Sequence, residues 1–170
     1  MNRVFAVLLA AISLSSCGYH LAGKSNVLPK NIQTIAVPAF GNVTTTYKLT
    51  DMLTEAVTRE FISRTKYHVN SDARNADAWV EGTVTQVSTF PTVYDPVTFR
   101  AANVEVHVNM HIRVLDRAGK VLMDRPGMDV RERYEVSVDP KTYFDESEMA
   151  MRRLSRDLAK TVVSAILENF

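Results

Sequence analysis

Alternation of apolar and polar residues is clearest between Asn103 and Leu115. Valine, methionine or isoleucine occupies every second position, and the positions between them are Glu105, His107, Asn109, His111 and Arg113. Because residues two apart lie on the same face of a strand, this pattern predicts a strand with one face against a core and the other toward water or a partner. Shorter β-branched or alternating runs predict further strands at Ile32–Val37, Tyr67–Asn70 and Ala78–Ser88.

Two segments have the apolar spacing of amphipathic helices, with apolar residues three and four apart. The first runs from Tyr47 to Arg64, and the threonines at 44–46 are candidates to cap it. The second follows Pro140, where Asp145 and Glu148 resemble a capping box, and it should run to about Leu167. The polar face expected for the first helix is Lys48, Asp51, Glu55 and Arg59, and the polar face expected for the second is Arg152, Arg153, Arg156 and Lys160.

The connections between these elements indicate the topology. Gly41, Asn42 and the threonines read as a loop, and Phe90–Arg100 reads as a connection between two strands. Val121–Asp124 and Met128–Val138 form an antiparallel return with an irregular edge at Pro126-Gly127. The order of elements predicts an α+β two-layer sandwich, with two helices packed on one face of a mixed, mostly antiparallel sheet of four to five strands.

The first residues have the pattern of an exported leader. A short basic region with Arg3 precedes an apolar run from Val4 to Leu14, which is too short to span a bilayer. Leu-Ser-Ser-Cys at 14–17 resembles the bacterial lipobox, which implies a lipoprotein cleaved before a lipid-modified, palmitate-bearing Cys17. An ordinary secretory leader cleaved near Ser16 is the alternative. We therefore predict a signal peptide over 1–16, a lipidated tether over 17–31 and a single domain over 32–170.

The charge balance and the length of the chain limit the class of function and the number of domains. The whole chain has 20 basic and 19 acidic side chains, and one basic residue lies in the leader, so the mature chain is formally neutral. Generalised nucleic-acid binding is therefore not expected. About 150 residues remain after cleavage, which is enough chain for one core.

Residue patterns typical of catalysis are not found. His107 and His111 share a strand face, but four residues at about 3.3 Å each separate the rings by roughly 13 Å, whereas ligands of one zinc ion lie within about 2 Å of it. The sequence also has no nucleophile elbow and no glycine-rich phosphate loop. We predict a protein that is not an enzyme, with no metal and no cofactor other than the lipid on Cys17.

Several short segments carry a family resemblance. They are Cys17-Gly18-Tyr19-His20-Leu21, Leu28-Pro29, Ile35-Ala36-Val37-Pro38, Leu53-Thr54-Glu55-Ala56 and Tyr134-Glu135-Val136-Ser137-Val138-Asp139-Pro140. Together they resemble the LptE family of lipopolysaccharide-assembly lipoproteins. The resemblance implies an α/β sandwich anchored on the periplasmic side of the Gram-negative outer membrane, which plugs the LptD β-barrel, assists its assembly and binds lipopolysaccharide. Gly18, in place of aspartate, is the pattern associated with sorting to that membrane.

A rival interpretation keeps the outer-membrane lipoprotein and changes its role. A strand reading Ile-Ala-Val followed by a helix is also similar to modules of the curli-secretion and Tol systems, which would make the chain part of a secretion or envelope scaffold. Co-purification with a large barrel protein would favour the first interpretation, whereas a homo-oligomeric ring would favour the second.

Two loop cations are candidates for contact with lipopolysaccharide, whose phosphates require cations and whose acyl chains require apolar surface. Arg100 follows the aromatic connection with Phe90, Tyr94 and Phe99, and Lys141 precedes Tyr143 and Phe144. The alternatives are that these aromatics pack back onto the domain and that both cations are merely solvated.

Overall fold

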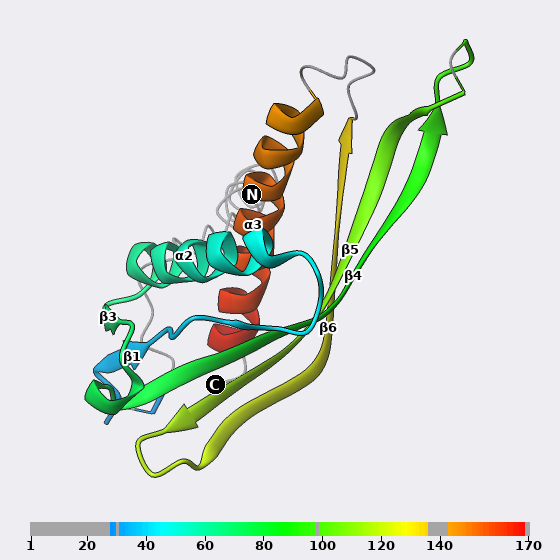
Figure 1. Ribbon diagram of the computed structural model, residues 1–170. Coiled ribbons are helices and arrows are strands. Elements are labelled where there is room, and N and C mark those ends of the chain that lie inside the picture. The colour runs from blue at the N-terminus through cyan, green and yellow to red at the C-terminus, as the bar shows by residue number, and fades with distance from the viewer. Residues whose placement is uncertain (1–27, 30, 98, 136–142, 169–170) are drawn as a thin grey trace, which may run out of the picture.

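The computed structural model describes residues 28–29, 31–97, 99–135 and 143–168, apart from the side chains of Tyr134 and of residues 143–147. Figure 1 shows two layers, a long twisted sheet and two helices that cover one of its faces. The helices are α2 (Tyr47–Arg64) and α3 (Tyr143–Glu168). This arrangement confirms the predicted α+β two-layer sandwich.

Three long strands form the larger part of the sheet. Strand β5 (Ala101–Asp116) lies between β4 (Ala78–Tyr94) and β6 (Val121–Glu135), and both neighbours are antiparallel to it. The register between β5 and β6 shifts where Met110 pairs with Met128 and Ile112 pairs with Arg125. The shift skips Pro126 and Gly127, so the irregular edge predicted there is confirmed.

Short strands extend the sheet on the other side of β4. Strands β1 (Thr34–Ala36) and β3 (His68–Asn70) are parallel, and β1 is also parallel to β4. The resulting order is β3-β1-β4-β5-β6, with β2 (Gly41–Asn42) paired to β4 off this path. The carboxylate of Asp77 accepts hydrogen bonds from the backbone of Gln33 and Thr34 at 3.0 Å each, which fixes the start of β1 and lowers the pKa of Asp77.

The core lies between the helices and the inner face of the sheet. Alternate β5 residues are buried as predicted, namely Val104, Val106, Val108, Met110, Ile112 and Val114. They meet α2 and α3 through Leu49, Leu53, Phe61, Leu154, Leu158, Val162 and Ile166. Burial of each such side chain stabilises the fold by roughly 1.5 to 3 kcal/mol, so packing supplies most of the stability.

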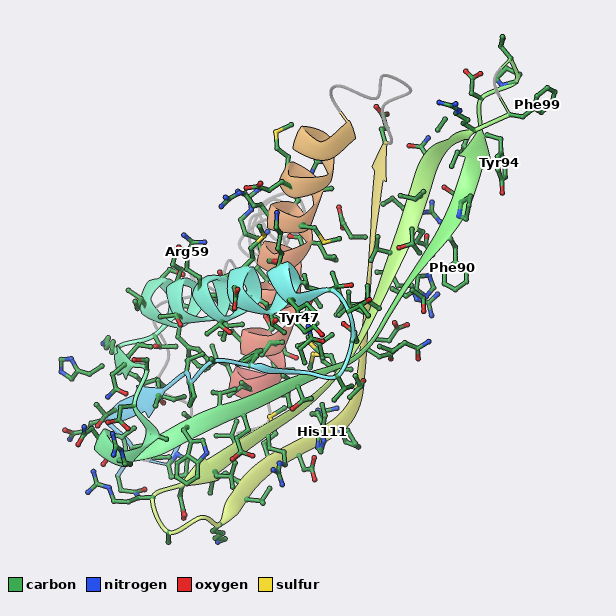
Figure 2. The ribbon with its side chains drawn as sticks, viewed as in Figure 1. Tyr47, Arg59, Phe90, Tyr94, Phe99 and His111 are labelled. Atoms are coloured by element: carbon green, nitrogen blue, oxygen red, sulfur yellow. The ribbon has the colours of Figure 1, made fainter. Side chains whose placement is uncertain are left out.

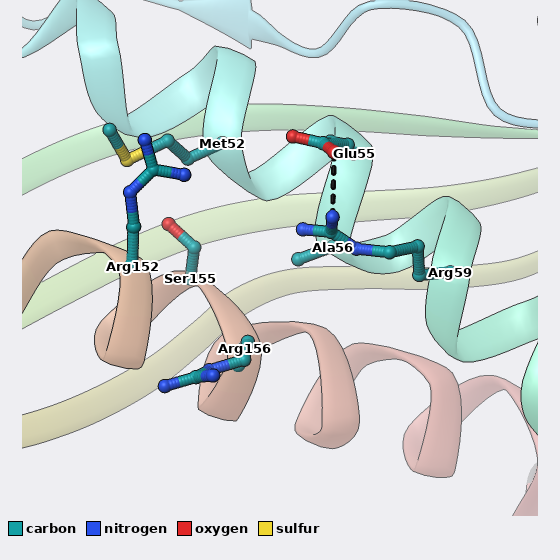
Figure 3. A pocket seen from close by; sticks show the side chains of 7 residues that line it. All are labelled: Met52, Glu55, Ala56, Arg59, Arg152, Ser155 and Arg156. Carbon is teal, nitrogen blue, oxygen red and sulfur yellow. Dashed lines mark hydrogen bonds and ion pairs between the residues drawn. The ribbon is translucent and has the colours of Figure 1, made fainter. Parts of the chain in front are cut away.

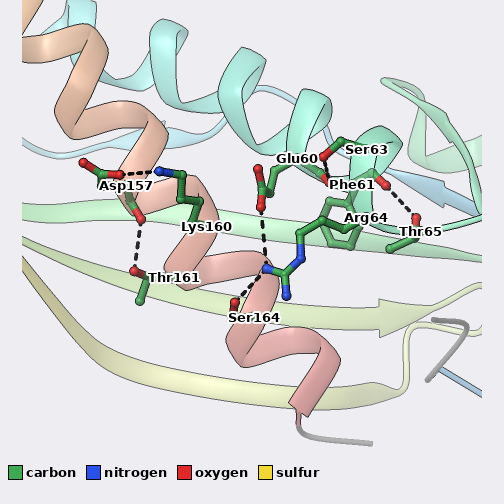
Figure 4. Close-up of polar contacts among 9 residues, drawn as sticks. All are labelled: Glu60, Phe61, Ser63, Arg64, Thr65, Asp157, Lys160, Thr161 and Ser164. Carbon is green, nitrogen blue, oxygen red and sulfur yellow. Dashed lines mark hydrogen bonds and ion pairs between the residues drawn. The ribbon is translucent and has the colours of Figure 1, made fainter. Parts of the chain in front are cut away.

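A polar seam joins the two helices where they cross. The Arg64 guanidinium donates to Ser164 Oγ at 2.7 Å and lies 3.5 Å from Glu60, as Figure 4 shows. Helix α2 ends at Arg64, and the backbone N–H and the hydroxyl of its C-cap residue, Thr65, both donate to the Phe61 carbonyl. Arg64 therefore links α2 to a residue 100 positions away along the chain.

Part of the predicted tether packs against the domain. Leu28 is 3% exposed and its backbone N–H donates to the Tyr67 hydroxyl at 3.0 Å. Cys17 and the rest of the predicted leader lie outside the described residues. Within the described part of the chain, no helix is long and apolar enough to cross a membrane.

The predicted connection over Phe90–Arg100 is wrong in its first half, because β4 continues to Tyr94. Pro91 pairs with Val104 inside this extension. Beyond Val84, β4 has no strand on its other side in the described sheet, and an edge strand accepts a proline because no second ladder requires its missing N–H. Proline and aromatic content therefore gave a misleading loop prediction.

Three local predictions near the helices are also corrected. The predicted loop at Gly41-Asn42 is strand β2. The side chain of Thr46 forms no cap on α2, and the Asn42 amide instead donates to the Thr46 carbonyl at 3.2 Å. Helix α3 begins at Tyr143, so Asp145 is its third residue and not its N-cap. Glu148 pairs with Arg152 along the helix at 2.7 Å, as i and i+4 neighbours do.

Candidate functional site

The tip of the β4–β5 hairpin exposes an unusual density of apolar side chains. Five of the ten large hydrophobic residues that the described chain exposes lie between positions 90 and 99: Phe90 51%, Val93 49%, Tyr94 59%, Val97 82% and Phe99 80%. Figure 2 shows Phe90, Tyr94 and Phe99 along the part of the hairpin that extends beyond the helices. For Tyr94 and Phe99 the sequence alternative, in which these aromatics pack back onto the domain, is therefore wrong, whereas the ring of Phe90 keeps a contact with the sheet. We call residues 90–100 the hairpin tip.

The turn of the hairpin tip is built around Asp95. Its backbone N–H donates to the Arg100 carbonyl at 2.8 Å, and its carbonyl accepts from the Phe99 N–H at 2.9 Å. Its carboxylate also accepts from the Val97 N–H at 3.0 Å. Hydrogen bonds thus tie together four described positions of the turn, from which the apolar side chains project.

Phe99 has a backbone conformation that is costly for a residue with a side chain. Its φ is +55°, and no other described residue except glycine has a positive φ. The left-handed region costs a residue of this kind about 1 to 2 kcal/mol. The Phe99 ring is 80% exposed, so packing within the described chain does not offset the cost of this backbone conformation. Strain of this type clusters at binding sites, which makes Phe99 a candidate contact residue.

A polar cluster supports the base of the hairpin tip. The ring of Phe90 meets His107 edge-on at 4.9 Å between centroids. His107 Nε2 lies 2.7 Å from Glu105, and Arg133 Nε donates to the other oxygen of Glu105 at 2.6 Å. These hydrogen bonds, first from Arg133 and then from His107, lower the pKa of Glu105. The cluster therefore fixes an orientation for Phe90 from three strands.

The outer face of the sheet, opposite the helices, is polar and internally paired. Glu81 binds Arg113 across β4 and β5 at 2.5 Å and accepts from the Trp79 indole N–H at 3.1 Å. His111 contacts Asp124 on β6 at 2.6 Å. His107 and His111 thus contact different carboxylates, as expected for polar residues on a sheet surface that do not share one ligand. No group of residues suited to a metal ion occurs in the described chain.

Only one of the predicted site residues falls within the described chain. Arg100 is exposed beside Phe99 at the hairpin tip and makes no ion pair with another described residue. Cys17 and Lys141 lie outside the described residues, as do the side chains of Tyr143 and Phe144. Sequence reasoning missed Val93 and Val97 as tip residues, although each flanks a proline or an aromatic within the segment that was singled out.

Comparison with known proteins adds a family and a fold. The LptE family model, described as lipopolysaccharide-assembly, matches residues 32–166, which is well over half of the chain. The solved structure of rare lipoprotein B from Shewanella oneidensis aligns with a TM-score of 0.51 at 12% identity, covering 79% of this chain and 95% of that chain. No protein in the curated set matches.

A second solved structure gives the same result. The lipoprotein B from Nitrosomonas europaea, which is described as uncharacterized, aligns with a TM-score of 0.53 at 14% identity. The alignment covers 85% of this chain and 87% of that chain. At such identity the likeness shows a shared fold, and the family match is the independent finding.

Proposed function

Because the chain belongs to the LptE family of lipopolysaccharide-assembly proteins, we propose that it acts in the assembly of lipopolysaccharide at the outer membrane. The proposed role is binding and assembly without a catalysed reaction, and without a cofactor other than covalent lipid. The observation that carries the proposal is the hairpin tip, where five exposed apolar side chains lie beside an arginine that makes no ion pair with another described residue.

The chemistry of the hairpin tip matches the two parts of lipopolysaccharide. Its acyl chains have apolar surface that Val97 and Phe99 would remove from water, with a gain of roughly 25 cal/mol per Å². Its phosphates would receive the Arg100 guanidinium, which forms forked, charge-assisted hydrogen bonds with phosphate oxygens. Lys141 is the second proposed cation, on grounds of sequence alone. We propose that the hairpin tip binds lipopolysaccharide.

The proposed location follows from the leader sequence and the family. Residues 1–16 would be removed, lipid on Cys17 would anchor the chain, residues 17–31 would form the tether, and residues 32–170 would form the domain on the periplasmic side. Stable anchoring requires more than one acyl chain, which a triacylated cysteine supplies. Globomycin should make a precursor accumulate in expressing bacteria, whereas processing that is indifferent to the drug would contradict lipidation.

The proposed partner is a barrel of the LptD type, in which the domain would act as a plug. The polar outer face of the sheet supports this role, because barrel interiors in the outer membrane are polar. The polar groups of this face, such as Glu81 with Arg113 and His111 with Asp124, already have partners within the chain. Detergent-solubilised outer membrane should yield a complex with a large barrel protein. A homo-oligomeric ring without a barrel would favour the secretion or envelope scaffold.

The experiment that tests the hairpin tip measures lipopolysaccharide binding by purified full-length variants. Arg100→Ala should weaken binding by about tenfold, as expected for the loss of a hydrogen bond to a charged group, and Arg100→Ala/Lys141→Ala should weaken it further. The matched control is Arg125→Ala, because Arg125 is also exposed and makes no ion pair with a described residue, but it lies at the opposite end of β6. All variants should retain the wild-type circular dichroism spectrum.

An apolar arm separates the acyl contribution from the charge. Phe99→Asn removes the ring and keeps a residue that tolerates the left-handed backbone, and Val97→Ser removes the neighbouring apolar group. Val121→Ser is the control, since Val121 is 44% exposed at the far end of the sheet. Equal affinity of the wild type, the double cation variant and Phe99→Asn at low and moderate salt would place the binding site elsewhere.

A further inference from the structure

A hollow of about 350 Å³ lies on the outer side of the helix pair, away from the hairpin tip. Helix α2 contributes Met52, Glu55, Ala56 and Arg59 to its lining, and α3 contributes Arg152, Ser155 and Arg156. Figure 3 shows the residues of α2 facing those of α3 across the hollow, with the guanidinium of Arg152 beside Met52. Three arginines and one carboxylate therefore line one small site.

Within the described part of the chain, the arginines use few of their hydrogen-bond donors. Arg59 donates to Glu55 at 2.6 Å and Arg152 donates to Glu148 at 2.7 Å, which uses one nitrogen of each guanidinium. Arg156 makes no hydrogen bond or ion pair with any other described residue. Since a guanidinium carries five N–H donors, the site retains far more donors than the chain satisfies.

The arginines leave the hollow with a net positive charge, although Glu55 pairs with Arg59 and Glu148 pairs with Arg152. Arg152 and Arg156 are four residues apart on one helix, where like charges repel, and Arg59 adds a third positive charge from α2. Lys160, one turn further, is already paired with Asp157 at 2.8 Å. An anion in the hollow would reduce the remaining repulsion, because Arg156 has no carboxylate partner among the described residues.

The floor of the hollow determines what kind of anion fits. Ala56 and Ser155 are 5% and 1% exposed, and their small side chains allow the two helices to approach closely beneath the arginines. Met52 adds an apolar wall. The Ser155 hydroxyl donates to the Met151 carbonyl at 2.8 Å, so its oxygen keeps a lone pair and no spare proton. The volume suits a small molecule or head group and is too small for a peptide segment.

We propose that this hollow binds a phosphate group, either that of a phosphate ester such as a lipid head group or that of free inorganic phosphate. Phosphate oxygens accept forked hydrogen bonds from arginine, and the apolar wall at Met52 would contact the carbon side of the ester. The site is separate from the hairpin tip, which lies at the end of β4 and β5. The proposal therefore does not depend on where lipopolysaccharide binds.

The test is calorimetric titration of the full-length protein in dodecyl maltoside, a detergent without phosphate, at low ionic strength. The probes are inorganic phosphate, sn-glycerol 3-phosphate and a tri-glutamate peptide. Both phosphate probes should bind at one saturable site. Arg156→Ala should weaken that binding by about tenfold, since a charge-assisted hydrogen bond is lost, and Arg156→Lys should weaken it less because the charge remains.

A neighbouring arginine provides the matched control. Arg153 is exposed on the same helix and does not line the hollow, so Arg153→Ala should retain the wild-type affinity. Tighter binding of glycerol 3-phosphate than of inorganic phosphate would identify an esterified phosphate as the ligand, and equal binding would identify the phosphate group alone. The proposal is overturned by the absence of saturable binding, by an unchanged affinity in Arg156→Ala, by an equal loss in Arg153→Ala, or by tri-glutamate binding as tightly as phosphate.

Discussion

Gly82→Ala should destabilise the fold, because Gly82 lies directly under an aromatic ring. Gly82 is on the buried face of β4, and a Cβ there would lie 2.5 Å from Phe40 Cε2, 2.6 Å from Cδ2 and 2.8 Å from Cγ. Such approaches are well inside van der Waals contact, so either the ring or the strand must move. The backbone of Phe40 is held by a hydrogen bond from its N–H to Thr54 Oγ1 at 3.1 Å.

The expected cost follows from the packing around Phe40. The ring is 7% exposed, and inserting a methyl group into a packed core costs typically 1 to 3 kcal/mol. For a chain of this size, 1 kcal/mol corresponds to about 2 to 4 °C in melting temperature, so Gly82→Ala should lower the melting temperature by about 2 to 12 °C. Thermal unfolding followed by circular dichroism measures this shift.

The control for backbone effects is Gly127→Ala. No heavy atom lies within 4 Å of the position that its Cβ would take, so the substitution should leave stability unchanged or raise it slightly by restricting the unfolded chain. Phe40→Leu and the double variant Gly82→Ala/Phe40→Leu complete a cycle, in which the smaller side chain should relieve most of the cost at Gly82. Two results would refute the reasoning: a cost at Gly82 no greater than at Gly127, or strict additivity of the two single changes.

Three further predictions follow from the core, the proposed anchor and the support of the hairpin tip. Val108→Asp should bury an unpaired carboxylate at a position with 0% exposure and lower the stability by several kcal/mol, with Asn109→Asp on the opposite face nearly neutral in the same melting assay. Cys17→Ser should release a folded domain into the periplasm, and a variant that resists high-salt washing of the membrane or does not fold would contradict this. Glu105→Gln should destabilise the protein at pH 7, and the difference from the wild type should shrink as pH falls below 4.5: hydrogen bonds from Arg133 and His107 lower the folded pKa of Glu105 from its ordinary value of 4.5, so its stabilisation is present above that value and is lost as pH falls through the lowered pKa. Urea unfolding at a series of pH values measures the free energy of unfolding, with Glu132→Gln as the control. If that free energy depends on pH in the same way in the wild type and in Glu105→Gln, the linkage is excluded.

Sequence patterns predicted the core well because burial is periodic. The bounds of α2 agree with the apolar spacing between Tyr47 and Arg64, and the alternating residues of β5 are buried as expected. In both cases one face of the element is covered, so the pattern of side chains is dictated by the same packing that forms the structure. The family resemblance was also confirmed, over residues 32–166.

Element ends were predicted less well, because they depend on neighbours that are distant in sequence. Pro91 favours a loop locally, yet it lies in β4 because the strand has a free edge there. Asp145 has the spacing of a capping residue, yet α3 begins two residues earlier. Neither outcome could be predicted from a local pattern, since each is decided by how far the adjacent element extends.

The two candidate sites differ in how much of each the sequence contained. The hairpin tip is one continuous segment, so its aromatics and Arg100 could be singled out before their exposure was known. The phosphate hollow joins Arg59 to Arg152 and Arg156, nearly a hundred positions later, and on each helix these residues belong to an ordinary polar face. Only the crossing of α2 and α3 makes them one site.

The projection of the hairpin tip follows from the lengths of the elements. Strand β4 has 17 residues, which span about 56 Å at 3.3 Å per residue, whereas α3 with 26 residues spans about 39 Å at 1.5 Å per residue. The longer of the two covering helices therefore cannot shield the full strand, and no residue of β4 after Val84 is buried. A chain selected for solubility alone would place polar residues on that excess length. This chain places Phe90, Val93 and Tyr94 there, so the energetic cost of their exposure is best explained by a partner that covers them.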